Sequence, residues 1–312
     1  MRFVAFTEFG GPEVVRIMER PVPVPGPGEV LVRVAASTVN PTDLLMRSGQ
    51  QAALIKELVP PYVGGMEFSG HVQAIGAGVD SVAVGQAVMG VVNPRRPAGG
   101  AHAEYLVVPA ASVAALAPST DLVDAATIPM NGLTAIMALE ALALPPGATL
   151  LVTGGPGAVG GYVIALARAQ GLRPLSDGRP EDAPMLRALG ADAVLPRGED
   201  TAVAARALFP DGVDGMVDTA LVASQVSRAV RDGGRAVSLR RSSPITDPRL
   251  TASYVGVLDR ADDTATLERL SKLLADGVLR PRVAHRLPMD QARQAHELVA
   301  RGGLRGRVVL TF

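Results

Sequence analysis

Residues 148–161 read ATLLVTGGPGAVGG, and this stretch decides the fold of the second half of the chain. The run from Ala148 to Thr153 predicts a buried strand, and a glycine-rich turn follows it at once. A helix is expected over Tyr162–Gln170, with Gly171 as its C-terminal stop. This order suits a dinucleotide, because glycines let the backbone approach the pyrophosphate and helix N–H groups meet its charge. A glycine-rich turn that binds no ligand is the alternative reading.

The elements around this stretch alternate between helix and strand. Asp121–Leu142 predicts a helical stretch with an internal break near Pro129–Gly132. Further strands are expected at Arg173–Ser176, Ala193–Leu195, Gly215–Asp218 and Arg235–Leu239, and further helices at Ala183–Leu189 and Ala202–Leu208. Such alternation predicts a parallel sheet with right-handed crossovers, the doubly wound α/β class.

The first third of the chain has a different texture, with short strands separated by glycine and proline. Strands are expected at Val14–Ile17, Glu29–Ala35, Gly70–Ile75, Ala87–Val92 and Ala103–Val108. Pro21–Gly28 predicts an extended connector, since proline lacks an N–H donor. Closely spaced short strands indicate a compact, barrel-like β domain. The C-terminal segment adds helices over Asp263–Ala275 and Met289–Arg301 and strands at Val283–Leu287 and Val308–Leu310.

The composition excludes several classes of function. The 312 residues contain 30 basic and 30 acidic side chains, which argues against a partner such as nucleic acid or an anionic membrane. There is no cysteine, so disulfides, thiolate catalysis and cysteine metal sites are excluded. The N-terminus enters strand-like alternation without an apolar leader, and no run approaches the length of a membrane span. A cytoplasmic, soluble protein of two domains is expected.

Several motifs in order along the chain resemble one family. They are the nucleotide loop Leu151–Gly160, Val39–Gly49 with its Asn-Pro-x-Asp and Arg-x-Gly pattern, Tyr62–Val72, Gly100–Tyr105, Ile128–Ala135, Leu189–Asp192 and Gly306–Leu310. Together they resemble the zinc-free quinone oxidoreductases of the medium-chain dehydrogenase/reductase superfamily. The resemblance covers essentially the whole chain. It implies a GroES-like β-barrel catalytic domain at 1–118, completed by 262–312, and a Rossmann-type cofactor domain at 119–261.

Zinc chemistry is not expected, although the superfamily also contains zinc alcohol dehydrogenases. Asn40 stands where a ligand cysteine would sit, and Met66-Glu67 stands where a His-Glu pair would sit. The four histidines are His71, His102, His285 and His296, and their spacing is not that of metal ligands. Each is expected to be an ordinary polar residue.

Without a metal to stabilise an alkoxide, reduction of a quinone or of an α,β-unsaturated carbonyl fits better than alcohol oxidation. The resemblance therefore implies hydride transfer from a nicotinamide cofactor to such a substrate. Two alternatives share the same motifs. One is an enoyl-thioester reductase or biosynthetic tailoring enzyme, and the other is a non-catalytic NADPH-binding regulatory or structural protein.

The cofactor choice depends on the end of the second strand, which reads Leu175-Ser176-Asp177-Gly178-Arg179. Ser176 and Arg179 favour a 2′-phosphate and so NADPH, whereas Asp177 departs from that pattern and would select NADH. NADPH is the prediction. The resemblance implies the other cofactor-binding residues: Asn40, Thr127, Gly154, Gly157, Ala158, Val159, Gly160, Thr219, Ser238, Leu239, Val255, Gly256, Val257 and Arg307.

Four residues are the catalytic candidates. By resemblance, Asn40 positions the nicotinamide ribose and the substrate carbonyl. Asp43 and Arg47 orient that loop or polarise the substrate, and their alternative is a structural Asp–Arg pair in a loop. Tyr62 is the only candidate proton donor. Strands near Ala236–Leu239 and Ser253–Leu258 are expected to reach a sheet edge, which predicts a homodimer.

Overall fold

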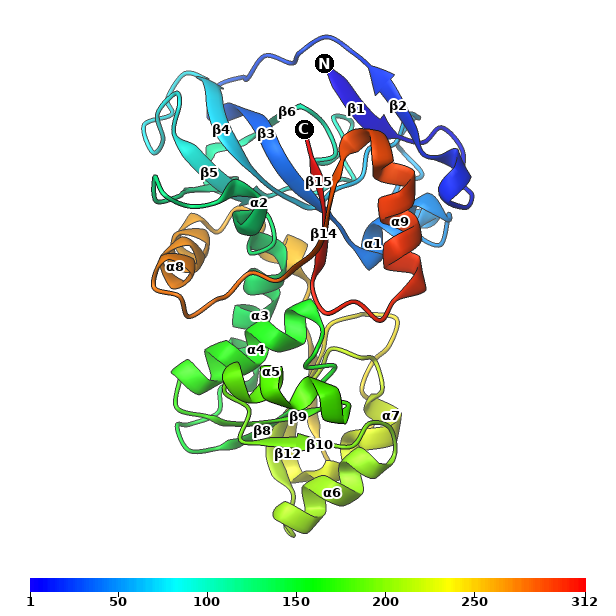
Figure 1. Cartoon of the computed structure of the whole chain (residues 1–312), viewed down its shortest axis with the longest axis vertical. Coiled ribbons are helices and arrows are strands. Elements are labelled where there is room, and N and C mark those ends of the chain that lie inside the picture. The colour runs from blue at the N-terminus through cyan, green and yellow to red at the C-terminus, as the bar shows by residue number, and fades with distance from the viewer. The chain divides into compact units, whose positions relative to one another are not determined.

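The computed structural model describes all 312 residues, and the chain divides into two compact units (Figure 1). The first comprises Met1–Met130, Arg260–Gly277 and Pro281–Phe312, and the second comprises Asn131–Asp259 and Val278–Arg280. The first unit continues past residue 118 because helix α2 (Leu122–Ala125) packs on its sheet. The domain boundaries at 118/119 and 261/262 stay a prediction.

The second unit is built on a six-stranded parallel sheet. Its strands are β8 (Thr149–Thr153), β9 (Arg173–Asp177), β10 (Ala193–Leu195), β11 (Val213–Asp218), β12 (Val230–Ser238) and β13 (Thr251–Tyr254). They lie in the order β10-β9-β8-β11-β12-β13, so the predicted doubly wound parallel sheet is confirmed. The strand order reverses between β8 and β11, and ligands of such sheets bind at the carboxyl ends of the strands at that point.

The helices of this unit are α3 (Pro129–Leu142), which begins in the first unit, α4 (Ala158–Ala169), α5 (Ala183–Ala188), α6 (Asp200–Leu208) and α7 (Ala223–Val226), with 3-10 turns at Pro180–Asp182, Ser227–Ala229 and Val257–Arg260. The helices α3 to α6 lie within or overlap the predicted helical stretches, whereas α7 was not predicted. Leu151, Leu175 and Met216 on neighbouring strands are fully buried in one apolar core. Leu151 belongs to the apolar run of β8, all five residues of which are buried, as expected for a central strand that helices cover.

The first unit contains a seven-stranded sheet and a separate pair, β1 (Arg2–Ala5) with β2 (Arg16–Glu19). The strands of the larger sheet are β3 (Glu29–Val39), β4 (Glu67–Ile75), β5 (Ala87–Val91), β6 (Tyr105–Pro109), β7 (Val113–Ala115), β14 (Val283–Pro288) and β15 (Arg307–Thr311). Its helices are α1 (Pro41–Arg47), α2, α8 (Thr264–Ala275) and α9 (Ala292–Arg301), with 3-10 turns at Pro12–Val14, Ala52–Leu54, Ala110–Ser112 and Met289–Gln291.

The C-terminal strand completes the sheet of the N-terminal third. β15 pairs antiparallel with β3, with Val309 opposite Thr38, and both chain ends lie in this unit (Figure 1). β14 pairs parallel with β15 at the edge of the sheet. This pairing brings residues near 307 beside residues near 39, a contact on which the site of this unit depends.

Two details differ from the sequence reading. The predicted break within the helical stretch is confirmed, but it lies at 126–128, just before the predicted position, and Pro129 begins α3. Proline suits a first helical position, where its missing N–H has no helical partner to lose. The glycine-loop helix begins at Ala158, four residues before its predicted start, because the small residues of its first turn do continue the helix.

No helix in the chain is long and apolar enough to cross a membrane.

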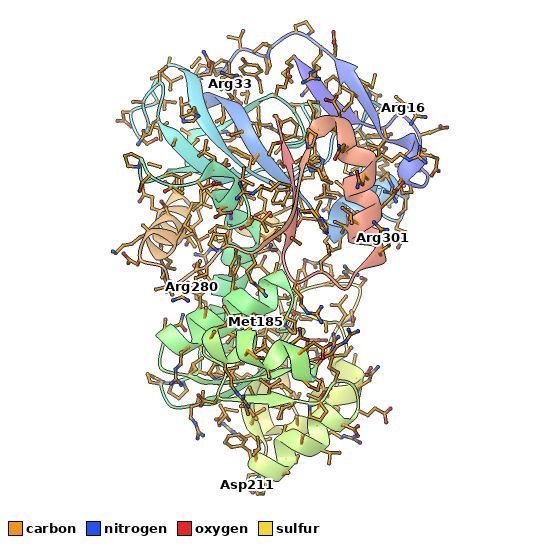
Figure 2. All side chains as sticks on the ribbon, in the orientation of Figure 1. Arg16, Arg33, Met185, Asp211, Arg280 and Arg301 are labelled. Atoms are coloured by element: carbon orange, nitrogen blue, oxygen red, sulfur yellow. The ribbon has the colours of Figure 1, made fainter.

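The arginines that supply nearly all the positive charge are mostly exposed, as Arg16, Arg33 and Arg301 show (Figure 2). Arg47 and Arg307 differ, because they are only 6% and 7% exposed. Both belong to the site of the first unit.

Candidate functional site

The glycine loop joins β8 to α4 at the point where the strand order of the second unit reverses. Gly154 has a φ of +66°, a conformation that favours glycine. A Cβ at Gly160 would lie 2.4 Å from the carbonyl oxygen of Gly154, so no side chain fits there. Gly157 caps α4, a helix of 12 residues, and Ala158 and Val159 form its first turn. Because first-turn N–H groups have no partner within the helix, this backbone suits the pyrophosphate of a dinucleotide.

The end of β9 carries the residues that were expected to choose between NADPH and NADH, and their contacts differ from the sequence reading. Ser176 is fully buried, and its hydroxyl donates to the carbonyl oxygen of Asp177 (3.0 Å). The Asp177 carboxylate accepts from the backbone N–H of Gly154 at 2.5 Å and lies 3.5 Å from the guanidinium of Arg197. Arg179 has a 60% exposed side chain and lies 3.7 Å from Glu181. Arg197 therefore stands beside the carboxylate that contacts the start of the glycine loop, whereas the sequence reading named only Arg179.

Other expected cofactor residues also lie at the carboxyl ends of strands in this unit. Thr219 follows β11 and donates through its hydroxyl to the carbonyl oxygen of Thr153 (2.5 Å). Ser238 ends β12, is buried, and donates to the carbonyl oxygen of Ser243 (2.8 Å). Leu239 follows Ser238, and Val255, Gly256 and Val257 follow the neighbouring strand β13. Thr127 belongs to the first unit, where it is buried and its hydroxyl donates to the carbonyl oxygen of Asp124 (2.8 Å).

Asn40 lies at the centre of a buried polar network in the first unit. Its side-chain oxygen accepts from Nη2 of Arg307 at 2.6 Å, and its side-chain nitrogen donates to Oγ1 of Thr38 at 3.1 Å. Nη2 of Arg307 also lies 2.6 Å from Oε1 of Glu67 and 2.5 Å from Oγ1 of Thr38. The other Glu67 oxygen accepts from the backbone N–H of Met130 (2.8 Å). Because Asn40 is 0% exposed, the predicted contact with substrate or ribose would require this group to become uncovered.

The ion pair within this network is enclosed. Glu67 is 0% exposed, and burial raises its pKa, while Arg307, Thr38 and Met130 act in the opposite direction. Arg307 was expected to bind cofactor. In the structure its guanidinium contacts Glu67, Asn40 and Thr38, which belong to the first unit, and it fixes the orientation of the Asn40 carboxamide.

Asp43 and Arg47 do not form the ion pair that was the structural alternative for them. One Asp43 oxygen accepts from the backbone N–H of Asn40 (2.7 Å) and the other from that of Gly65 (2.8 Å). Asp43 thus caps α1 from its third position, as a capping-box acid does. Arg47 donates to Nδ1 of His296 at 3.1 Å and to the carbonyl oxygen of Gly10 at 3.2 Å, and burial lowers its pKa.

Tyr62 stands in an aromatic cluster near the same helix. Its ring stacks on Phe9 with a centroid separation of 5.6 Å and an interplanar angle of 9°, and lies 5.4 Å from Phe6. Its hydroxyl is 3.5 Å from the carbonyl oxygen of Leu58, a long contact for a hydrogen bond. The hydroxyl is therefore only weakly committed, and its role as a proton donor stays a prediction.

Comparison with known proteins gives matches over most of the chain. A family model for the alcohol dehydrogenase GroES-like domain matches residues 26–118, and one for the zinc-binding dehydrogenase matches residues 189–310. A quinone oxidoreductase from Sus scrofa is 29% identical over 99% of this chain and 97% of its own length. The solved quinone oxidoreductase from Coxiella burnetii has a TM-score of 0.90 at 26% identity, over 100% of this chain and 99% of its own. A mycobacterial protein solved in complex with NADPH has a TM-score of 0.84 at 28% identity, over 100% of both chains.

The chain is a member of the medium-chain dehydrogenase/reductase superfamily. Its full-length relatives include quinone oxidoreductases, and the predicted resemblance and fold class are confirmed. This superfamily member is an oxidoreductase.

Three residues of this superfamily member contact the predicted site residues but were not themselves predicted as site residues from the sequence. Arg197 lies 20 residues after Asp177 and follows β10, so the parallel pairing of β9 with β10 brings the two together. Glu67 was considered only as a zinc-site position, and its pairing with Arg307 spans 240 residues. Thr38 was not singled out, although its hydroxyl contacts Glu67, Asn40 and Arg307. The burial of Glu67 and Arg307 and the pairing of their strands through β3 are visible only in the structure, so no local signal pointed to this contact.

Proposed function

We propose that the protein is an NADPH-dependent, zinc-independent reductase that passes a hydride to a quinone or an α,β-unsaturated carbonyl. The observation that carries the proposal is the glycine loop at the switch point of the parallel sheet, where a side chain at Gly160 would meet backbone. The names of the full-length relatives support a quinone-type acceptor.

The choice of NADPH is supported by the charges around Asp177. A free carboxylate at this position would accept hydrogen bonds from ribose hydroxyls and repel a 2′-phosphate. Here the carboxylate is already engaged by the backbone N–H of Gly154 and lies beside Arg197, which offsets its charge. Arg197 and Arg179 then present two exposed guanidinium groups suited to a phosphate. In this proposal Arg197 takes the role that the sequence reading gave to Ser176.

Zinc independence is supported by the contacts of Asn40, Met66 and Glu67, the residues at the positions where zinc ligands were considered. Asn40 gives its carboxamide to Arg307 and Thr38, and Glu67 is paired with Arg307. The sulfur of Met66 accepts from the hydroxyl of Thr42 at 3.1 Å. These groups are neutral or already paired, whereas a zinc site needs thiolate, imidazole or free carboxylate ligands.

When bound, the nicotinamide supplies the hydride. The residues of the chain bind the cofactor and orient the side chains of the site. First-turn N–H groups of α4 receive the pyrophosphate. In the first unit, Arg307 fixes the Asn40 carboxamide, and Asp43 holds the start of α1 through the backbone N–H groups of Asn40 and Gly65. The proton that completes reduction comes from solvent or from the hydroxyl of Tyr62, and a Tyr62→Phe variant with undiminished turnover assigns it to solvent.

We also infer a homodimer formed through β13. This strand is the edge of the six-stranded sheet, and all four of its residues are exposed. An edge strand has unpaired backbone groups that a second copy can satisfy. Light scattering at working concentration tests this, and a monodisperse monomer contradicts it.

The first experiment measures oxidation of NADPH, and separately of NADH, by the purified protein with one ortho-quinone and one enone. NADPH-specific oxidation supports the proposal. Preference for NADH makes Asp177 the cofactor selector and contradicts the assignment of Arg197. Tight NADPH binding without turnover of any substrate in a panel favours a non-catalytic binding protein.

A matched pair of variants sharpens the cofactor assignment. Arg197→Ser is expected to weaken NADPH binding at least tenfold in fluorescence titration and to leave NADH binding within a factor of two or three, since only the phosphate contact is lost. Arg173→Ser is the control, because Arg173 is a comparably exposed arginine of the same unit that lies 3.4 Å from Asp192. An equal loss for both cofactors in Arg197→Ser contradicts the assignment.

A further inference from the structure

Two histidines that are 194 residues apart in the sequence are buried side by side in the first unit. His102 precedes β6 and His296 lies in α9, and they are 1% and 3% exposed. Their ring centroids lie 6.3 Å apart in an edge-to-face arrangement. Together with Asp43 and Gly64 they line a small cavity of about 10 Å³ whose other lining residues are apolar.

The hydrogen bonds of each ring fix which nitrogen carries the proton. Nε2 of His102 lies 3.0 Å from the carbonyl oxygen of Thr38, and because a carbonyl only accepts, this nitrogen carries the hydrogen. In the neutral ring, Nδ1 of His102 is then an acceptor. Nδ1 of His296 lies 3.1 Å from a guanidinium nitrogen of Arg47, which only donates. Nδ1 of His296 therefore accepts, and its Nε2 carries the hydrogen.

His296 stays neutral in the folded protein. Burial, together with the nearby His102 and Arg47, lowers the pKa of His296 to about 3. The tautomer with the hydrogen on Nε2 is consequently the form present at neutral pH.

The cavity thus brings together one acceptor and one donor that have no hydrogen-bond partner among the protein groups, Nδ1 of His102 and Nε2–H of His296. The carboxylate of Asp43 is a second acceptor in the lining. A ligand that both donates and accepts is needed, and the volume is at the lower limit for one water molecule. A cation does not suit the site, because the lone pair of Nδ1 of His296 faces Arg47 and its Nε2 carries a hydrogen.

We propose that this cavity is the site of one structural water molecule, which accepts from Nε2–H of His296 and donates to Nδ1 of His102 and to Asp43. The water joins α9 to the loop before β6 and to α1. Asp43 accepts from the backbone N–H groups of Asn40 and Gly65. The water therefore contacts the side chain that positions the backbone of Asn40. The site is independent of the proposed reductase activity.

A crystal structure of the full chain at about 1.5 Å or better, at neutral pH, tests the proposal directly. A water peak at hydrogen-bonding distance, about 2.7–3.2 Å, from both nitrogens is expected. No density in the cavity, or a peak with the anomalous signal of a metal, overturns it.

A solution measurement tests the two tautomers independently. The chain has only four histidines, so spectra of protein labelled with ¹⁵N at histidine are readily assigned with His71→Gln and His285→Gln variants. Both buried rings are expected as the Nε2–H tautomer, and Nε2–H of His296 is expected to show a cross-peak to a water molecule. A hydrogen on Nδ1 of His102, or no water cross-peak, contradicts the proposal.

Gly64→Ala provides a matched variant. The added Cβ would lie 3.0 Å from Oδ1 of Asp43 and 3.1 Å from Nδ1 of His102, where the proposed water has its two acceptors. Loss of the water peak and of the cross-peak from His296 is expected. A water signal unchanged in a folded Gly64→Ala variant overturns the assignment, and the wild-type measurements stand whether or not this variant folds.

Discussion

Acidification is expected to destabilise the first unit through His296. In the folded protein its pKa falls from 6.5 to about 3, first because it is buried and then because of His102 and Arg47. In the unfolded chain the ring takes up a proton near pH 6.5, whereas the folded chain takes it up only near pH 3. The contribution of the neutral His296 ring to the free energy of unfolding is therefore fully present above pH 6.5. It is lost progressively as the pH falls towards 3.

The size of the effect follows from this shift. Each unit of pH below 6.5 costs about 1.4 kcal/mol until the folded pKa is reached, so His296 alone removes about 2 kcal/mol between pH 8 and pH 5. His296→Gln keeps an acceptor for Arg47 but cannot be protonated. Between pH 8 and pH 5 the free energy of unfolding of this variant is expected to fall by about 2 kcal/mol less than that of the wild type.

Urea denaturation followed by far-UV circular dichroism at pH 8 and pH 5 measures the difference. His285→Gln serves as the control, because His285 is exposed and this substitution is expected to leave the pH dependence as in the wild type. If His296→Gln and the wild type lose equal stability between the two pH values, His296 is not a buried neutral histidine and the reasoning fails.

Three further predictions concern the buried networks and the glycine loop. Arg307→Met leaves the carboxylate of Glu67 buried without its cation, so it is expected to cost about 3–5 kcal/mol in urea denaturation. The double variant with Glu67→Gln should cost less than this, and a double cost equal to the sum of the two single costs would show that the pair is not coupled. Gly160→Ala places a Cβ 2.4 Å from a carbonyl oxygen of the loop and is expected to weaken cofactor binding at least tenfold in a titration, with far-UV circular dichroism confirming the fold; unchanged affinity would show that the loop does not form the cradle. Asp43→Asn replaces a charged acceptor of two backbone N–H groups by one with a single acceptor oxygen, so a loss of about 1–2 kcal/mol in thermal or urea unfolding is expected, and a neutral outcome would contradict its capping role.

Asp43 and Asn40 belong to the same motif but make different kinds of contact. Within the Asn-Pro-x-Asp stretch, both oxygens of Asp43 are occupied by backbone N–H groups, while the Asn40 side chain is held by Arg307 and Thr38. Asp43 thus shapes the start of α1, and the Asn40 side chain is held in place by Arg307 and Thr38. A loss of activity on changing Asp43 would therefore report a loss of position, and it is expected together with lower stability.

Local sequence was sufficient to predict the parallel sheet and the glycine loop, whereas the division into two domains came from the resemblance to a family. The apolar run of β8, the glycines after it and the small residues of α4 each act within a few residues of one another, so their pattern alone predicts strand, turn and helix. The alternation of the later strands and helices predicted the parallel sheet for the same reason.

The partners of the buried polar side chains were decided only by tertiary structure. Arg307 reaches Thr38 across 269 residues because β15 pairs with β3, and Arg47 reaches His296 across 249 because α9 packs beside α1. Asp177 meets Arg197 through the register of two parallel strands. A periodic pattern shows which face of a strand or helix is buried, but it carries no information about which distant side chain lies opposite. The sequence therefore determined the scaffold, and the packing of distant strands and helices determined which charges and histidines meet.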